Sequence, residues 1–174
     1  MVKKVKNIIL NELPLAKALA GEAQAWADQG WQGVTQTTYE LLAYWFNRGE
    51  EADEKFHICQ QRAIETIIYC HEILGIKTLK EAFERFAPEI LAQKTLKEAF
   101  ERFAPEILAQ SAALSEEADN ITFPKYCLKM ATGTGKTWVL AALLVWQYFN
   151  AINNEREKQY SAHFVLVAPG HEVL

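Results

Sequence analysis

The residues best suited to chemistry lie in one short stretch, Lys129–Trp138, with the sequence KMATGTGKTW. Gly133 and Gly135 have no side chains, so the backbone N–H groups around them can turn inward toward an anion. Lys136 has the charge and the length to reach the terminal phosphates of a nucleotide, and the hydroxyl of Thr137 suits Mg²⁺. The apolar segment that follows is expected to be a helix, whose N-terminus favours negative charge. The stretch therefore predicts a phosphate-binding loop.

The spacing of this loop departs from the general pattern G-x-x-x-x-G-K-[ST]. Met130 stands where that pattern has its first glycine, and a glycine occupies the middle of the loop instead. The competing interpretation is a glycine-rich turn with an incidental lysine. The run Gly-x-Gly-Lys-Thr between a predicted strand and a predicted helix favours nucleotide binding. The residues expected to bind the nucleotide are Thr132, Gly133, Thr134, Gly135, Lys136 and Thr137.

The composition of the 174-residue chain limits the possible classes of protein. The length suits one ordinary domain, or one small domain and part of another. A net charge of -4 does not indicate nucleic-acid binding, although a basic track can lie on an acidic body. The most apolar run, Trp138–Phe149, is shorter than the ~20 residues that span a bilayer. We therefore predict a cytoplasmic protein without a membrane segment.

Three cysteines at unrelated spacings favour reduced, buried thiols over a disulfide framework. A zinc site is the alternative for His57, Cys59, Cys70 and His71. On one continuous helix the two cysteines of this group would lie about 16 Å apart. Zinc requires all its ligands within ~2.3 Å of one ion. Core packing is the preferred interpretation of these residues.

Helices are predicted over residues 8–30 and 37–48, with a break at the glycine-containing run 30–33. Thr37 or Thr38 is the expected N-cap of the second helix. A third helix is expected from about Phe56 to Leu74, with Gly75 as its stop. Tryptophans in the first two segments could stack bases, but their helical spacing favours core positions. These are Trp26, Trp31 and Trp45.

One segment of 17 residues, KTLKEAFERFAPEILAQ, occurs at 77–93 and again without change at 94–110. Each copy predicts a short amphipathic helix that ends before Ala-Pro, with Thr78 or Thr95 as its cap. A helical repeat module is one interpretation. Solenoids contain about three or more units, and their sequences diverge. An in-frame duplication is the preferred interpretation.

The pattern after residue 125 predicts an α/β fold. A short strand at Tyr126–Met130, a helix at 136–152 and a strand within 163–169 form a βαβ unit, which predicts parallel strands and a right-handed crossover. The predicted organisation is a helical N-terminal region (1–55), a helix ahead of the loop (56–76), the duplicated insert (77–110), a linker (111–125) and the start of a P-loop NTPase domain (126–174).

The stretch LKMATGTGKT resembles motif I of superfamily 2 helicases, in which glycine occupies the middle of the loop. It is most similar to the type III restriction enzyme Res-subunit branch of the DEAD/DEAH-box helicases. The segment FHICQQRAIETIIYCHE resembles the region ahead of motif I in that branch, and the match puts Gln60 where a glutamine reads the adenine edge. Gln61 and Arg62 depart from the Arg-Glu that commonly follows. HFVLVAPGHEVL resembles motif Ia, which implies that Pro169 and Gly170 touch the nucleic-acid backbone.

The resemblance covers about residues 56–76 and 128–174. It implies an incomplete RecA-like domain that binds ATP and Mg²⁺, with Lys136 as the catalytic residue, within a DNA helicase or translocase. A modification methyltransferase subunit is the implied protein partner. The family also uses a carboxylate motif and a second lobe with arginines. Glu155, Glu157 and Glu172 are poor candidates for that carboxylate.

We therefore expect the N-terminal part of a longer motor, inactive by itself, with exposed apolar surface on its last strand. The alternative is a catalytically silent remnant or interaction protein that at most binds nucleotide. An unrelated P-loop enzyme such as a small kinase is the third interpretation. The helicase-like run VLVAPG argues against it.

Overall fold

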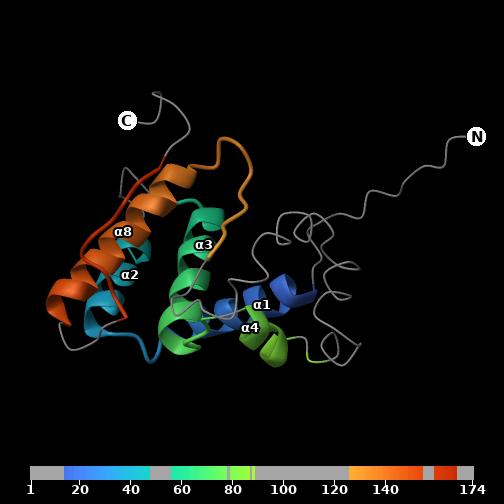
Figure 1. The fold of residues 1–174 in the computed structure, drawn as a ribbon. Coiled ribbons are helices and arrows are strands. Elements are labelled where there is room, and N and C mark those ends of the chain that lie inside the picture. The colour runs from blue at the N-terminus through green and yellow to red at the C-terminus, as the bar shows by residue number, and fades with distance from the viewer. Residues whose placement is uncertain are drawn as a thin grey trace, which may run out of the picture. The chain divides into compact units, whose positions relative to one another are not determined.

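In a computed structural model the chain divides into two compact units. Figure 1 shows the helices that they contain. Unit 1 combines residues 1–30 with 65–127, and unit 2 combines 31–64 with 128–174. The residues that the structure describes are 14–47, 56–77, 79–86, 88, 126–154 and 159–167. Within them no helix is both long enough and apolar enough to cross a membrane.

Helix α1 of unit 1 spans Pro14–Asp28, inside the segment where a helix was predicted. A proline at the first helical position costs nothing, because that N–H has no partner within a helix. Gly30 ends the segment with a φ of 83°, which only glycine adopts easily. Ala23 and Trp26 are buried on this helix, so the prediction that Trp26 is a core residue is confirmed.

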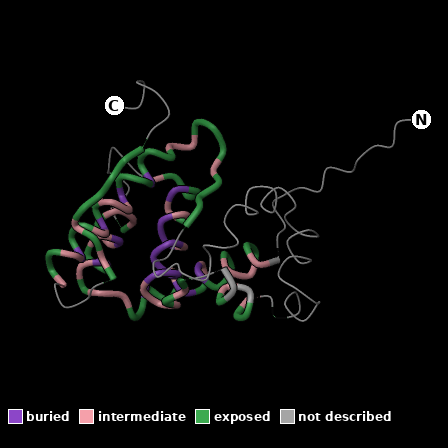
Figure 2. The backbone as a smooth tube through the Cα atoms, in the orientation of Figure 1, coloured by how far each residue is buried: buried purple, intermediate pink, exposed green. Residues whose placement is uncertain are grey.

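The helix ahead of the loop is longer than α3 alone. Helix α3 spans Ile58–Ile68, and a π-helical turn, η2, continues it over Tyr69–Ile73. Gly75 follows with a φ of 60°, as expected for a stop. Figure 2 shows buried residues along this helix, and the ring of Tyr69 lies 5.2 Å from that of Trp26, centroid to centroid. The π-helical turn was not predicted, because it follows no distinct sequence pattern.

Helix α4 spans Leu79–Phe86 and packs against α1. The carboxylate of Glu81 accepts the backbone N–H of Lys77 at 2.8 Å, which satisfies a donor just ahead of the helix. The described part of this helix ends at Phe86, and Pro88 is itself helical; residue 87, where the Ala-Pro break was predicted, lies outside the described residues. The predicted caps Thr78 and Thr95, and the whole second copy at 94–110, lie outside the described residues.

Helix α2 of unit 2 spans Gln36–Phe46, and its N-cap is Thr35. The hydroxyl of Thr35 accepts the backbone N–H of Thr38 at 3.1 Å. The prediction of Thr37 or Thr38 as the cap was therefore wrong. Thr38 is fully buried inside the helix instead, and its hydroxyl bonds to another helix.

Helix α8 spans Lys136–Asn153 and packs on α2, as Figure 1 shows. The contact is polar at its centre. Trp146 Nε1 donates to the Thr38 hydroxyl at 3.0 Å, and Asn150 Nδ2 donates to the same oxygen at 2.9 Å. Thr35 Oγ1 bonds to the side-chain oxygen of Asn150 as well. The side-chain N–H groups of Trp146 and Asn150 therefore have acceptors, as buried polar groups require.

The two remaining tryptophans of the N-terminal region belong to an aromatic cluster in unit 2. Trp31 is buried, and its ring lies 6.3 Å from that of Phe46. Trp45 is half-buried, and its ring lies 6.1 Å from that of Phe56. Trp31 has a φ of 56°, in the left-handed region that bulky residues avoid. Packing of its large ring compensates for that backbone conformation, and the prediction of a core role holds for Trp31.

The predicted strands do not occur in the described residues. Residues 126–130 and 163–167 have neither helix nor strand structure. A strand forms when its backbone N–H and C=O groups pair with a neighbouring strand, and the described residues supply none. Val165 and Val167 are 90% and 92% exposed, so the apolar surface expected here does face solvent. The described fold is helical, and the βαβ unit is not seen in it.

The buried amide of Asn150 allows a test of the contact between α2 and α8. In Asn150→Ala the Thr38 hydroxyl loses one donor and Thr35 loses an acceptor. We expect the free energy of unfolding to fall by about 1–3 kcal/mol. Asn153→Ala is the matched control, because Asn153 is exposed and its amide donates to the Thr37 hydroxyl at the surface. This change should cost less than ~0.5 kcal/mol. Urea denaturation followed by circular dichroism measures both, and equal losses would contradict the assignment.

Cysteine reactivity should differ between the described thiols. Burial raises the pKa of Cys70 to about 11, whereas Cys59 and Cys127 are exposed. Because the thiolate is the nucleophile, iodoacetamide should alkylate the two exposed cysteines and spare Cys70 at about pH 8. Because the pKa of Cys70 is raised in the folded chain, its contribution to the free energy of unfolding is fully present below the ordinary pKa of 9.0. That contribution is lost as the pH rises through about 11.

Mass spectrometry of the alkylated peptides identifies which cysteine has reacted. In denaturant the three thiols should react at equal rates. Alkylation of Cys70 as fast as that of Cys59 in the native chain would contradict the burial of that thiol.

Candidate nucleotide-binding site

The predicted loop lies in unit 2, directly ahead of α8. Gly133 and Gly135 have φ values of 79° and 73°, and Gly135 is the N-cap of the helix. Thr134 closes the turn, since its hydroxyl donates to the Ala131 carbonyl at 2.7 Å. Left-handed backbone at both glycines is what a loop needs to direct its N–H groups to one side. The prediction that glycine provides the turn is consistent with this conformation.

Lys136, the first residue of α8, folds back across the loop. Its Nζ donates to the carbonyl oxygen of Ala131 at 2.8 Å and to that of Met130 at 3.2 Å. The side chain is exposed, as is that of Thr137, the next residue. The ammonium group therefore lies beside the same turn that the two glycines form. Both of its acceptors are neutral, so an anion can compete for the lysine.

Gln60 reaches the loop from the first turn of α3. Its side chain is 5% exposed. Oε1 accepts the backbone N–H of His57 at 2.8 Å, as the third residue of a helix does in a capping box. Nε2 donates to the Thr134 carbonyl at 2.9 Å. One buried carboxamide therefore caps the start of α3 and anchors the loop.

The loop and Gln60 approach each other too closely for a side chain at Gly135. A Cβ added there would collide with Nε2 of Gln60 and would lie 3.5 Å from Trp138 Cδ1. A Cβ at Gly133 would meet nothing within 4 Å. A side chain at position 135 is therefore excluded both by the contact with Gln60 and by the left-handed backbone. At position 133 only the left-handed backbone disfavours a side chain.

The structure brings most of the predicted binding residues together. Gln60 and residues 132–137 lie in one unit, and the glutamine contacts the loop directly. Pro169 and Gly170, predicted to contact nucleic acid, lie outside the described residues. In the part of the chain that is described, no group of three His, Cys, Asp or Glu side chains could hold a metal ion. The prediction of core packing is confirmed for Cys70 and His71, which are buried, but it was wrong for His57 and Cys59, which are exposed.

Two features of this site were not predicted from the sequence. The bond between Gln60 and the backbone of His57 could have been predicted. Glutamine at the third position of a helix commonly bonds back to the residue just ahead of the helix, and Gln60 has that position relative to His57. Trp138 begins the most apolar run of the chain, but its side chain is 60% exposed one turn from the loop. The apolar run Trp138–Phe149 does not show which face of its helix meets solvent.

The class of protein follows from a comparison with known families. A model described as type III restriction enzyme, res subunit, matches residues 53–174, more than half of the chain. The chain belongs to this family, which consists of helicase-like ATPases. The matched range contains Gln60, the loop and α8. No curated protein and no solved structure matches the chain.

Substitution of the two glycines should separate steric from backbone effects. Gly135→Ala should lower stability more than Gly133→Ala, because only the first places a methyl group against Gln60. Each should cost about 1–2 kcal/mol for the left-handed backbone, and Gly135→Ala should cost roughly 1–3 kcal/mol more for overpacking. Thermal or urea unfolding of the purified variants measures these costs.

The control for this comparison is the Gln60→Ala background. Removal of the carboxamide eliminates the collision, so Gly135→Ala should then cost about as much as Gly133→Ala. An unchanged difference between the two alanine variants in that background would show that Gln60 does not constrain the loop.

Proposed function

We propose that this chain binds Mg·ATP through Gln60 and residues 132–137 and forms the ATP-binding part of a DNA helicase or translocase of the type III restriction kind. The observation that supports this most is the loop at the start of α8. It combines left-handed glycines, an N-terminal lysine and a buried glutamine anchor. Membership of a helicase-like ATPase family supports the same reaction class.

The phosphates would bind at the N-terminus of α8. Backbone N–H groups of the loop and the helix dipole attract negative charge there. Lys136 would exchange its bonds to the carbonyls of Met130 and Ala131 for bonds to phosphate oxygens. An ammonium group is attracted more strongly to a charged phosphate oxygen than to a neutral carbonyl oxygen. The exposed hydroxyl of Thr137 would coordinate the Mg²⁺ that accompanies the nucleotide.

Gln60 would read the adenine base. A carboxamide has two N–H donors and two lone pairs on its oxygen. The bonds to Thr134 and His57 use one donor and one lone pair. The second N–H and the second lone pair match the N7 acceptor and the N6 donor of adenine. The same residue would then link base recognition to the position of the phosphate loop.

Bound ATP supplies the energy for movement along DNA, and the residues of this chain would hold it in place. Lys136 is the proposed catalytic residue, because it would neutralise charge on the transferred phosphate. Hydrolysis also requires a carboxylate that positions water and an arginine that stabilises the transition state. We propose that these come from other parts of the motor, that Pro169 and Gly170 contact the DNA backbone, and that a modification methyltransferase subunit is a partner.

Calorimetric titration with Mg·ATP tests the proposal. The unaltered chain should bind, and Lys136→Ala should bind at least about tenfold more weakly, because a charged hydrogen bond is worth roughly 1.5–3 kcal/mol. Lys129→Ala is the matched control, since Lys129 is an exposed lysine ahead of the loop. It should bind as the unaltered chain does. Gln60→Ala should weaken ATP more than GTP, whose base lacks the N6 donor.

The outcomes distinguish the proposal from its alternative. Equal binding by the Lys136 and Lys129 variants would overturn the assignment of the loop. Absence of binding by the unaltered chain would favour the silent remnant or interaction protein. An ATPase assay with and without DNA then shows whether the bound nucleotide is hydrolysed.

A further inference from the structure

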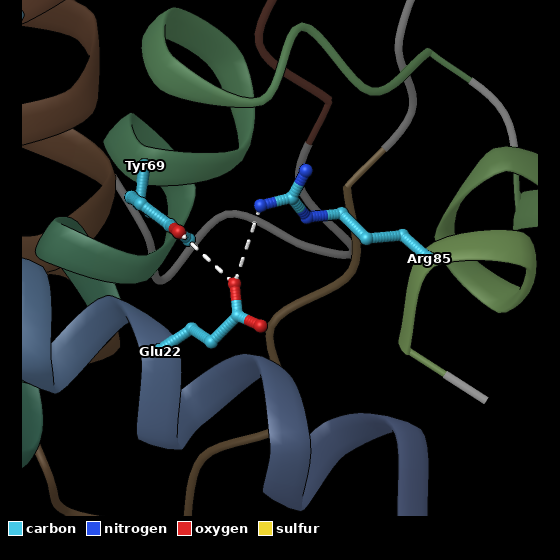
Figure 3. Close-up of polar contacts among 3 residues, drawn as sticks. All are labelled: Glu22, Tyr69 and Arg85. Carbon is cyan, nitrogen blue, oxygen red and sulfur yellow. Dashed lines mark hydrogen bonds and ion pairs between the residues drawn. The ribbon is translucent and has the colours of Figure 1, made fainter.

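One carboxylate connects three helical segments of unit 1. Oε2 of Glu22, on α1, accepts the hydroxyl of Tyr69 at 3.1 Å and lies 3.4 Å from Nη2 of Arg85 (Figure 3). Tyr69 belongs to η2 and is buried against Trp26. Arg85 belongs to α4, and its guanidinium lies 5.5 Å from the ring centroid of Phe86. We use the name α1 seat for the surface formed by Glu22 of α1 and Tyr69 of η2, because α4 docks on this surface.

The docked helix is the first of two identical segments. Residues 94–110 repeat residues 77–93 at every position. The residues of the first copy that form the contacts described above are Lys77, Glu81, Arg85 and Phe86. Their counterparts in the second copy are Lys94, Glu98, Arg102 and Phe103. The second copy lies outside the described residues, so only its sequence enters here.

Only one copy at a time can make the contact that α4 makes with Glu22 Oε2. Glu22 is the single glutamate of α1, and one of its oxygens already bonds to both Tyr69 and Arg85. Two segments of identical sequence make identical contacts with one surface. Their docking free energies can therefore differ only through the chain segments that connect each copy to the rest of unit 1.

We propose that residues 94–110 are a second occupant of the α1 seat and exchange with residues 77–93 within the same molecule. The connection from η2 is residues 74–78 for the first copy and would be 74–95 for the second, which favours the first by roughly 9-fold in loop-closure probability. The connection onward to Tyr126 would be 104–125 for the second copy in place of 87–125, which favours the second by roughly 2-fold. The first copy is thus preferred by only about 4-fold.

Hydrogen exchange of the whole chain, read by mass spectrometry, tests the proposal with a matched pair of variants. Glu84 lies in the interior of α4, where proline removes a backbone hydrogen bond and clashes with the preceding turn. Glu101 is the same position of the second copy. Each proline also gives its copy a distinct mass, so the peptides can be told apart.

In Glu101→Pro the first copy and α1 should keep their protection. In Glu84→Pro, residues 94–110 should become protected from exchange in place of residues 77–93. The protection of α1 should fall by no more than about 4-fold. In the double variant both copies and α1 should lose protection well beyond that. Unchanged exchange in α8 shows that each variant is still folded. A chain with one copy deleted, which is the same sequence whichever copy is removed, gives the reference for a fully docked segment.

A charge reversal shows whether the second copy uses the same seat. In the Glu84→Pro chain, Glu22→Arg should reduce the protection of residues 94–110, and Arg102→Glu added to it should restore that protection. The proposal is overturned if residues 94–110 stay unprotected in Glu84→Pro, or if α1 loses as much protection there as in the double variant. Protection of residues 94–110 that increases with protein concentration would also overturn it, because the seat would then belong to another molecule.

Discussion

The position of the candidate site depends on one buried hydroxyl, that of Thr38. This oxygen accepts hydrogen bonds from Trp146 and Asn150 of α8, and all three side chains are buried. An unpaired buried donor costs more than a paired one contributes, so few registers of α2 against α8 are acceptable. The loop is the N-terminal end of α8. The register that satisfies Thr38 therefore also determines where Lys136 begins the helix within unit 2.

A second constraint acts at the loop itself. Gln60 holds the start of α3 through His57 and holds the loop through Thr134. Because both bonds come from one carboxamide, the loop and the start of α3 cannot shift independently without the loss of a partly buried hydrogen bond. Lys136 is restrained less firmly, since it is exposed and bonds to neutral carbonyls. The backbone of the site is therefore preorganised, whereas its charged group can be redirected.

Local sequence predicted the helices better than their ends. The apolar run after Gly135 predicted α8 nearly to the residue, because glycine at the N-cap and continuous helix formers agree there. Three threonines between 35 and 38 have similar capping propensity, and α8 decides among them by bonding to Thr38. The strands depended on partners that the described residues do not supply. The glutamine was expected to face adenine, but its bond to Thr134, 74 residues away, has no local signal.

The duplicated segment also shows what local sequence cannot predict. Residues 77–93 and 94–110 have the same propensities, the same amphipathic pattern and the same caps. No property of either segment alone can decide which of the two would dock against α1. The distinction must come from outside the segment, from the chain lengths on either side and from a single acceptor at Glu22. Helix formation here is a local property of the sequence, and docking is a property of the whole chain.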